Sequence, residues 1–193
     1  MSSASRLFSD VQEALLSFRH DDPEQMHRAV EYGEFAASGP DTLWRSHAYG
    51  HITASALVVS TELDAVLLTL HPKVGRWLQL GGHLEVDDVS LQRAALREVE
   101  EECGFSQGEI SPLPVRLDRH PVPCGRLPDG SARASTHWDI QFVVRVRGTL
   151  VPRISSESDD LRWFAMDEIP HLDDSVRALI ADAHRTRDWV PFG

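Results

Sequence analysis

The chain has 193 residues, enough for one domain with a hydrophobic core and one additional element. Hydrophobic residues make up 41% of it and charged residues 25%, and no apolar run approaches the roughly 20 residues that a membrane span needs, so we expect no membrane insertion. The formal net charge of -11 argues against binding of nucleic acid through a broad basic surface, because Lys and Arg supply most of that affinity.

The first segment, residues 1–45, is predicted to form an N-terminal helical extension. Its start lacks the basic residues and the continuous apolar stretch of a secretory signal, so we expect a cytoplasmic protein. Apolar residues recur at helical spacing on both sides of Asp21, Asp22 and Pro23, which predicts two amphipathic helices joined by a tight turn. These helices could cap a pocket, form a homodimer interface or simply pack on a sheet.

Short apolar runs rich in β-branched residues follow this extension. Residues 52–59 and 65–70 are separated by a polar stretch and are predicted to be paired strands. Residues 76–80 predict a further short strand, which runs into the glycine pair Gly81 and Gly82.

An amphipathic helix is predicted after the acidic turn that follows the glycine pair. Asp88 or Ser90 can cap its start, and Gly104 can end it. Its buried face is predicted from apolar residues at four-residue steps. These residues are Leu91, Ala95 and Val99.

The remaining chain is predicted to form three strands followed by one closing helix. Strands are expected at residues 114–122, 136–146 and 161–166, a loop at 124–135 and a helix at 174–186. Strands on both sides of an embedded helix, with helices at the two ends, predict an α/β sandwich with a mixed sheet.

Three carboxylates lie on one face of the predicted central helix. Glu98, Glu101 and Glu102 occupy positions i, i+3 and i+4, and Arg97 can orient Glu101 through a charge-assisted hydrogen bond. Clustered hard oxygen ligands suit Mg²⁺ or Mn²⁺, which would also let an acidic protein bind a phosphorylated small molecule. Alternatively, these glutamates form a solvated helix face, as acidic runs usually do.

The stretch from Gly81 to Phe105 resembles the Nudix box of MutT-like hydrolases, G-x5-E-x7-R-E-U-x-E-E-x-G-U, in which U is a bulky aliphatic residue. Arg97 to Phe105 fits position by position, with Phe105 as the last apolar residue. The first half departs from the pattern. Counting from Gly82, Asp88 stands where the family has glutamate, and eight rather than seven residues separate it from Arg97, which leaves the role of Asp88 open.

The resemblance implies a Nudix-type α/β/α sandwich over residues 46–193, behind the N-terminal extension. It also implies a pyrophosphohydrolase that uses Mg²⁺ or Mn²⁺ to cleave the diphosphate of a nucleoside diphosphate linked to another moiety. The expected partner is therefore a small nucleotide-like substrate, with no nucleic acid and no membrane. Two alternatives are a diphosphate isomerase on the same scaffold and a ligand-sensing module without turnover.

The same resemblance implies roles for particular residues. Glu98, Glu101 and Glu102 are expected to bind the metal, with the backbone carbonyl of Gly81 completing the set. A carboxylate must also accept a proton from the attacking water. Glu98 or Glu102 could do so from the helix, and Glu157 could do so from a late loop.

Two pairs of polar residues occur at strand spacing outside the box. Asp118 and His120 stand two apart in one predicted strand, and His137 and Asp139 stand two apart in another, so each pair lies on one face of its strand. These four could form a second site that binds a metal or the substrate. They could equally be hydrogen-bonded residues at strand ends.

The tryptophans and cysteines have simpler interpretations. Trp77, Trp138 and Trp163 could stack on a base, although large aromatic residues more often belong to the core. Cys103 is expected to pack away from the three glutamates. Together with Cys124 it is expected to remain a reduced thiol.

Overall fold

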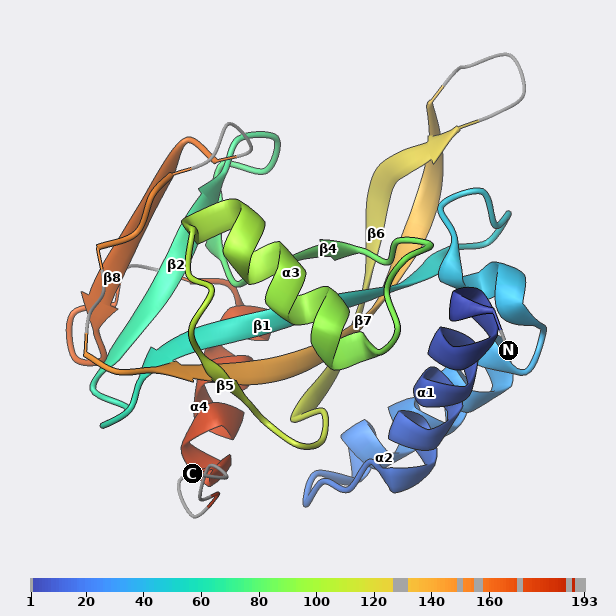
Figure 1. Cartoon of the computed structure of the whole chain (residues 1–193), viewed down its shortest axis with the longest axis horizontal. Coiled ribbons are helices and arrows are strands. Elements are labelled where there is room, and N and C mark those ends of the chain that lie inside the picture. The colour runs from blue at the N-terminus through green and yellow to red at the C-terminus, as the bar shows by residue number, and fades with distance from the viewer. Residues whose placement is uncertain are drawn as a thin grey trace.

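The computed structural model shows a sheet with helices on both of its faces (Figure 1). It describes residues 2–126, 132–148, 151–154, 158–169, 172–186 and 189. The helices of this part are α1 (Ser3–Ser17), α2 (Pro23–Ala36), the short 3-10 helix η1 (Pro40–Leu43), α3 (Leu91–Cys103) and α4 (Asp174–Arg185). The strands are β1 (His51–Ser60), β2 (Ala65–His71), β3 (Arg76–Leu78), β4 (Leu80–His83), β5 (Glu109–Ile110), β6 (Arg116–Arg126), β7 (Ala132–Val146) and β8 (Asp160–Ala165).

The strands form one mixed sheet with the order β3-β2-β1-β7-β5, to which β4, β6 and β8 are added beside β1, β7 and β2. The β1–β7 pair is parallel, and its register places His51 opposite His137 and Thr53 opposite Asp139. The other pairs are antiparallel. The expected α/β sandwich with a mixed sheet and N-terminal helices is confirmed.

The two faces of β1 are covered by different helices. Ala54, Ala56 and Val58 pack in the hydrophobic cluster that includes α1, α2 and α3. Leu57 and Val59 pack in a second cluster with α4. Successive strand residues point to opposite faces of the sheet. The even-numbered residues of β1 therefore face α3, and the odd-numbered residues face α4.

Helix α3 is capped at both ends by its own flanking residues, and a carboxylate of α1 also accepts a hydrogen bond from its first turn. The Ser90 hydroxyl accepts a hydrogen bond from the Arg93 amide, so Ser90 rather than Asp88 is the N-cap. Gly104 closes the helix in the left-handed conformation at a φ of 76°. The Leu91 amide donates to the Asp10 carboxylate of α1 at 2.7 Å, which ties α3 to the N-terminal segment.

The N-terminal helices belong to the main hydrophobic core. Leu7, Val11 and Tyr32 are buried, and they share one cluster with β1, β7 and α3. The loop between α1 and α2 also contacts α4, because His20 Nε2 lies 3.1 Å from a buried Asp182 oxygen. Helices α1 and α2 therefore pack against the sheet and α3 as part of the core.

The long hairpin of β6 and β7 differs from its prediction. Residues 124–135 were expected to be a loop, yet β6 continues to Arg126 and β7 begins at Ala132. The register of the β6–β7 pair shifts between Val122 and Gly125, and this irregularity accommodates Pro123 within β6 while the pairing with β7 continues. Cys124 consequently lies in a strand.

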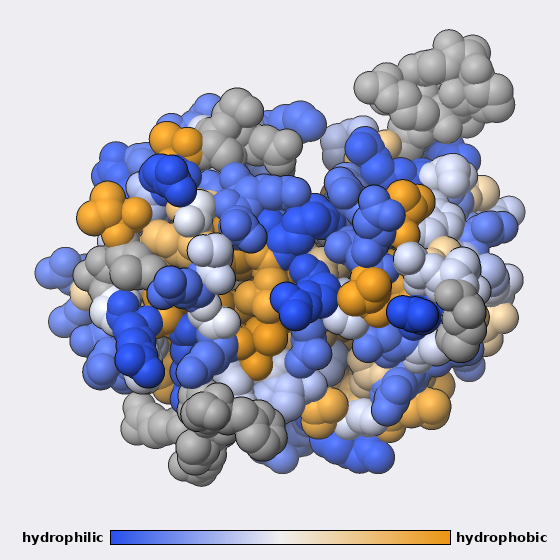
Figure 2. Space-filling model, in the orientation of Figure 1, coloured by the Kyte–Doolittle hydropathy of each residue, from blue (hydrophilic) through white to orange (hydrophobic). Residues whose placement is uncertain are grey.

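The surface in Figure 2, seen from the same side, is mainly hydrophilic with scattered hydrophobic patches. Among the described residues, no helix is both long and apolar enough to cross a membrane.

Candidate active site on helix α3 and strand β4

Arg97 holds two of the three glutamates of α3. Its Nη1 donates to Glu98 Oε1 at 3.0 Å and to Glu101 Oε2 at 2.9 Å. Glu98 is buried and the Glu101 side chain is 56% exposed, so the pair spans the boundary between protein and solvent. The guanidinium offsets repulsion between like charges on one helix face.

Asp88 holds the other side of the same guanidinium. Arg97 Nε donates to Asp88 Oδ1 at 3.2 Å and Nη2 donates to Oδ2 at 3.1 Å, a paired arrangement of two parallel bonds. Asp88 Oδ2 also accepts from the Glu85 amide at 2.8 Å. Burial opposes the charge on Arg97, but the hydrogen bonds to Asp88 and the charges of Glu98 and Asp88 outweigh it and raise the Arg97 pKa. Asp88 thus anchors the arginine despite the residue inserted in this loop.

The glycine pair of β4 makes room for two carboxylates beside the backbone. A Cβ on Gly82 would lie 2.8 Å from both oxygens of Glu98. Gly81 has a φ of +150°, and a Cβ there would lie 2.3 Å from the Ser55 Cβ. The Gly81 amide donates to Glu102 Oε1 at 2.8 Å. A side chain at either glycine would displace Glu98 or the neighbouring strand.

These carboxylates suit a hard divalent cation. Glu98 and Glu102 offer oxygen atoms beside the glycine pair of β4, and Arg97 joins Glu98 to the more exposed Glu101. The donor set therefore fits Mg²⁺ or Mn²⁺. Glu157 lies outside the described residues.

The two polar strand pairs lie beside one another. In the β6–β7 register Asp118 pairs with Asp139 and His120 with His137, so the four side chains share one face. The imidazole centroids of His120 and His137 are 5.4 Å apart, and His120 Nδ1 is 2.8 Å from Asp118 Oδ2. The hydrogen bond to Asp118 raises the pKa of His120.

Asp139 is held by hydroxyl and amide groups. Its carboxylate accepts from Thr53 Oγ1 at 2.9 Å, Ser55 Oγ at 2.6 Å and Gln141 Nε2 at 3.0 Å. Burial raises the Asp139 pKa, and these hydrogen bonds oppose the shift. Thr53 and Ser55 belong to the side of β1 opposite α3, so the polar pairs and the helix glutamates lie on different faces. Gln79, the residue between β3 and β4, also donates from Nε2 to Asp139 Oδ2 at 3.4 Å.

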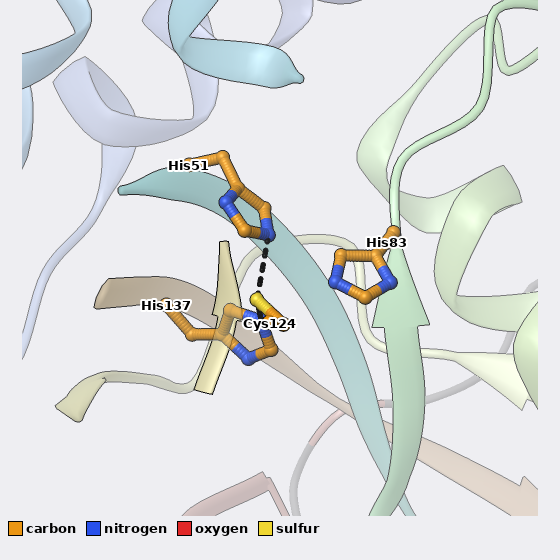
Figure 3. A group of neighbouring side chains, drawn as sticks. All are labelled: His51, His83, Cys124 and His137. Atoms are coloured by element: carbon orange, nitrogen blue, oxygen red, sulfur yellow. Dashed lines mark hydrogen bonds between the residues drawn. The ribbon is translucent and has the colours of Figure 1, made fainter. Parts of the chain in front are cut away.

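His137 also belongs to a group that the sequence did not predict. His51, His83, Cys124 and His137 come from four strands, and one ligand atom of each lies within 4.8 Å of all the others (Figure 3). Burial lowers the pKa of His51 and of His83 to about 4 and that of His137 to about 2, so the three imidazoles are neutral at neutral pH. Burial raises the pKa of the Cys124 thiol.

Other residues considered from the sequence serve packing. Trp138 stacks on Phe35 of α2 with ring centroids 4.3 Å apart, and Arg119 lies over the same indole. Trp77 packs edge-on against Phe164. Cys103 is buried and its sulfur is 3.0 Å from the Val99 carbonyl oxygen, as expected for a packing residue.

Comparison with known proteins relates this geometry to one family. A family model described as NUDIX domain matches residues 50–183. A NUDIX family hydrolase from Clostridium perfringens is 22% identical, with a TM-score of 0.51, and the match covers 70% of this chain and 97% of that one. The NUDIX domain of Shewanella oneidensis NrtR, solved with ADP ribose, is 19% identical, with a TM-score of 0.51, and the match covers 79% and 96%. No curated protein sequence matches the chain. Since the family model covers more than half of its residues, the chain belongs to the Nudix family.

Proposed function

We propose that this protein is a metal-dependent pyrophosphohydrolase that cleaves the diphosphate of a nucleoside diphosphate linked to a second moiety. The observation that carries the proposal is the set of three α3 glutamates, of which Glu98 and Glu102 lie against the glycine pair of β4 while Arg97 joins Glu98 to Glu101. A regulatory module without turnover would not require this carboxylate set. ADP ribose, present in the Shewanella NrtR structure, has the proposed chemistry and is a suitable first compound.

Each residue of the α3 site has a proposed role. Glu98, Glu101 and Glu102 would hold Mg²⁺ or Mn²⁺, with the Gly81 carbonyl as a further ligand. When bound, the ion neutralises the diphosphate, polarises phosphorus and increases the acidity of water. Arg97 keeps Glu98 and Glu101 in place, and the Gly81 amide does the same for Glu102.

The reaction is the addition of water across one phosphoanhydride bond. The water oxygen bonds to one phosphorus, the bond from that phosphorus to the bridging oxygen breaks, and two phosphate-ended products leave. A carboxylate accepts the proton of the attacking water. Glu98 and Glu102 are the proposed bases on the helix, with Glu157 as a third candidate.

The polar strand pairs are proposed to form a second site on the other side of β4, in which Asp118 and His120 contact the substrate. His120 bonds to Asp118 through Nδ1, which leaves Nε2 for a ligand, and its side chain is 41% exposed. Asp139 is buried and would act by positioning the hydroxyls of Thr53 and Ser55.

The test is product identification after incubation with a panel of diphosphate compounds and Mg²⁺. The panel contains sugar nucleotides, ADP ribose, dinucleoside polyphosphates, coenzyme derivatives and oxidised nucleoside triphosphates. We expect cleavage of at least one compound by the wild-type protein and its loss in Glu102→Gln. Folded protein that cleaves none of them with Mg²⁺ or Mn²⁺ would contradict the proposal.

A further inference from the structure

We propose that His51, His83, Cys124 and His137 form a second metal site, which binds Zn²⁺ or a similar late first-row transition metal and is separate from the carboxylate site on α3. The site joins β1, β4, β6 and β7, and the four side chains point toward a common centre (Figure 3).

The spacing of the three imidazoles suits one ion. Their ring centroids form a nearly equilateral triangle, with 5.0 Å between His51 and His83, 4.9 Å between His51 and His137, and 5.1 Å between His83 and His137. The Cys124 sulfur lies 3.3 Å from His137 Nε2 and 3.9 Å from His51 Nε2. Zinc bonds of about 2.0–2.3 Å in a tetrahedron separate neighbouring ligand atoms by about 3.3–3.7 Å. Side-chain movements of about 1 Å would therefore complete the geometry.

An unsatisfied polar atom at the same place supports a bound ion. His83 Nε2 is buried and has no hydrogen-bond partner within the described part of the chain, and it faces the other three side chains (Figure 3). A buried polar atom without a partner costs free energy, and an ion bound to this nitrogen would remove that cost. The aromatic contacts between the rings do not satisfy the nitrogen.

The donor types select the metal. Imidazole nitrogen and thiolate sulfur favour Zn²⁺ and its late first-row neighbours, whereas Mg²⁺ prefers oxygen. On metal binding Cys124 loses its proton to solvent and coordinates as thiolate. Four protein ligands fill a tetrahedral zinc shell, which is the pattern of a structural site.

The proposed site is linked to the α3 site through a single residue. The His83 imidazole belongs to the metal group, while its backbone carbonyl accepts a hydrogen bond from Arg97 Nη2 at 2.9 Å. An ion that fixes His83 would therefore also fix the end of β4 on which Arg97 rests. The proposed role of the ion is to position Arg97 through His83, not to contact the substrate.

Metal binding can be tested without reference to turnover. The 193-residue protein is stripped of metal with a chelator and dialysed. It is then supplied with excess Mg²⁺ to occupy the carboxylates and titrated with Zn²⁺ against a chromophoric chelator. We expect one tightly bound equivalent of Zn²⁺. Replacement by Co²⁺ should give the strong visible absorption of a four-coordinate ion and a thiolate-to-cobalt band in the near ultraviolet.

Variants separate this site from adventitious binding. Cys124→Ser should abolish the thiolate band and weaken Zn²⁺ binding at least about 10-fold, the lower end of the effect of losing an outer-shell partner. Cys103→Ala and His27→Ala remove a thiol and an exposed imidazole elsewhere and should change neither property. His51→Ala should lose the bound equivalent, with circular dichroism as the check of folding.

Three outcomes would overturn the proposal. One is a wild-type protein that takes up no Zn²⁺ in excess Mg²⁺, and another is a Co²⁺ complex with a six-coordinate spectrum and no thiolate band. The third is a Cys124→Ser protein that binds Zn²⁺ and Co²⁺ as the wild type does. If His51→Ala does not fold, the Cys124→Ser spectrum decides the question.

Discussion

Replacing Asp88 with asparagine tests how the Nudix helix is held. The Asp88 carboxylate is buried and accepts two hydrogen bonds from Arg97 and one from the Glu85 amide. Asparagine has nearly the same shape, but its amide nitrogen would face an N–H donor of Arg97 or Glu85 and could not accept its hydrogen bond. Loss of one hydrogen bond between charged groups gives about 2 kcal/mol of destabilisation, within the ~1.5–3 kcal/mol range for such bonds. The larger penalty for a fully unpaired buried charge does not apply, because Arg97 keeps Glu98 and Glu101.

The assay compares Asp88→Asn with Asp87→Asn, an exposed neighbour that changes net charge by the same amount. For a chain of this size, about 2 kcal/mol corresponds to a fall in Tm of about 4–8 °C. The freed guanidinium should pair more tightly with Glu98 and Glu101 and compete with Mg²⁺, so the Mg²⁺ concentration for half-maximal turnover should rise about 10-fold. Equal Tm values and equal Mg²⁺ requirements in the two variants would refute the anchoring role of Asp88.

The remaining predictions concern the metal ligands and the attachment of the outer helices. Glu101→Gln should lower kcat by at least ~10- to 100-fold with little change in Tm, because the residue is half-exposed; a wild-type rate at limiting Mg²⁺ would contradict its assignment. Leu7→Ala should cost about 2–5 kcal/mol, whereas Leu16→Ala, 77% exposed, should cost little; equal denaturant midpoints would show that α1 is not part of the core. Asp182→Asn should cost about 3 kcal/mol in thermal unfolding, since its buried carboxylate pairs with Arg116, Arg185 and His20. Asp174→Asn, on the exposed side of α4, is the control, and an equal effect would refute the pairing.

Local patterns predicted the central helix and its carboxylates. Ser90 and Gly104 cap α3 as expected, because caps depend on the backbone within a few residues. Helical spacing alone places Glu101 near Arg97. The partner of Asp88 could not be predicted in the same way, because the inserted residue shifts its spacing from Arg97 and only the loop conformation brings the two together.

Pairing between strands that are distant in the sequence brings together His51, His83, Cys124 and His137, a group that the sequence alone did not predict. His51 meets His137 through the parallel β1–β7 register, and these residues are far apart in the chain. The glycines and the proline of residues 124–135 predict a loop that includes Cys124, whereas the hairpin continues through an irregular pairing. His83 after the glycine pair was the available signal, but one histidine does not identify its partners.

Cleavage in water labelled with heavy oxygen tests the central claim most directly. The best compound of the panel is hydrolysed by wild-type protein with Mg²⁺ in labelled water, and the products are analysed by mass spectrometry. The account predicts two phosphate-ended products, one of which carries a single labelled oxygen from the attacking water, and no products with Glu102→Gln. Unlabelled products, products without a broken phosphoanhydride bond, or an equal rate in Glu102→Gln would contradict it.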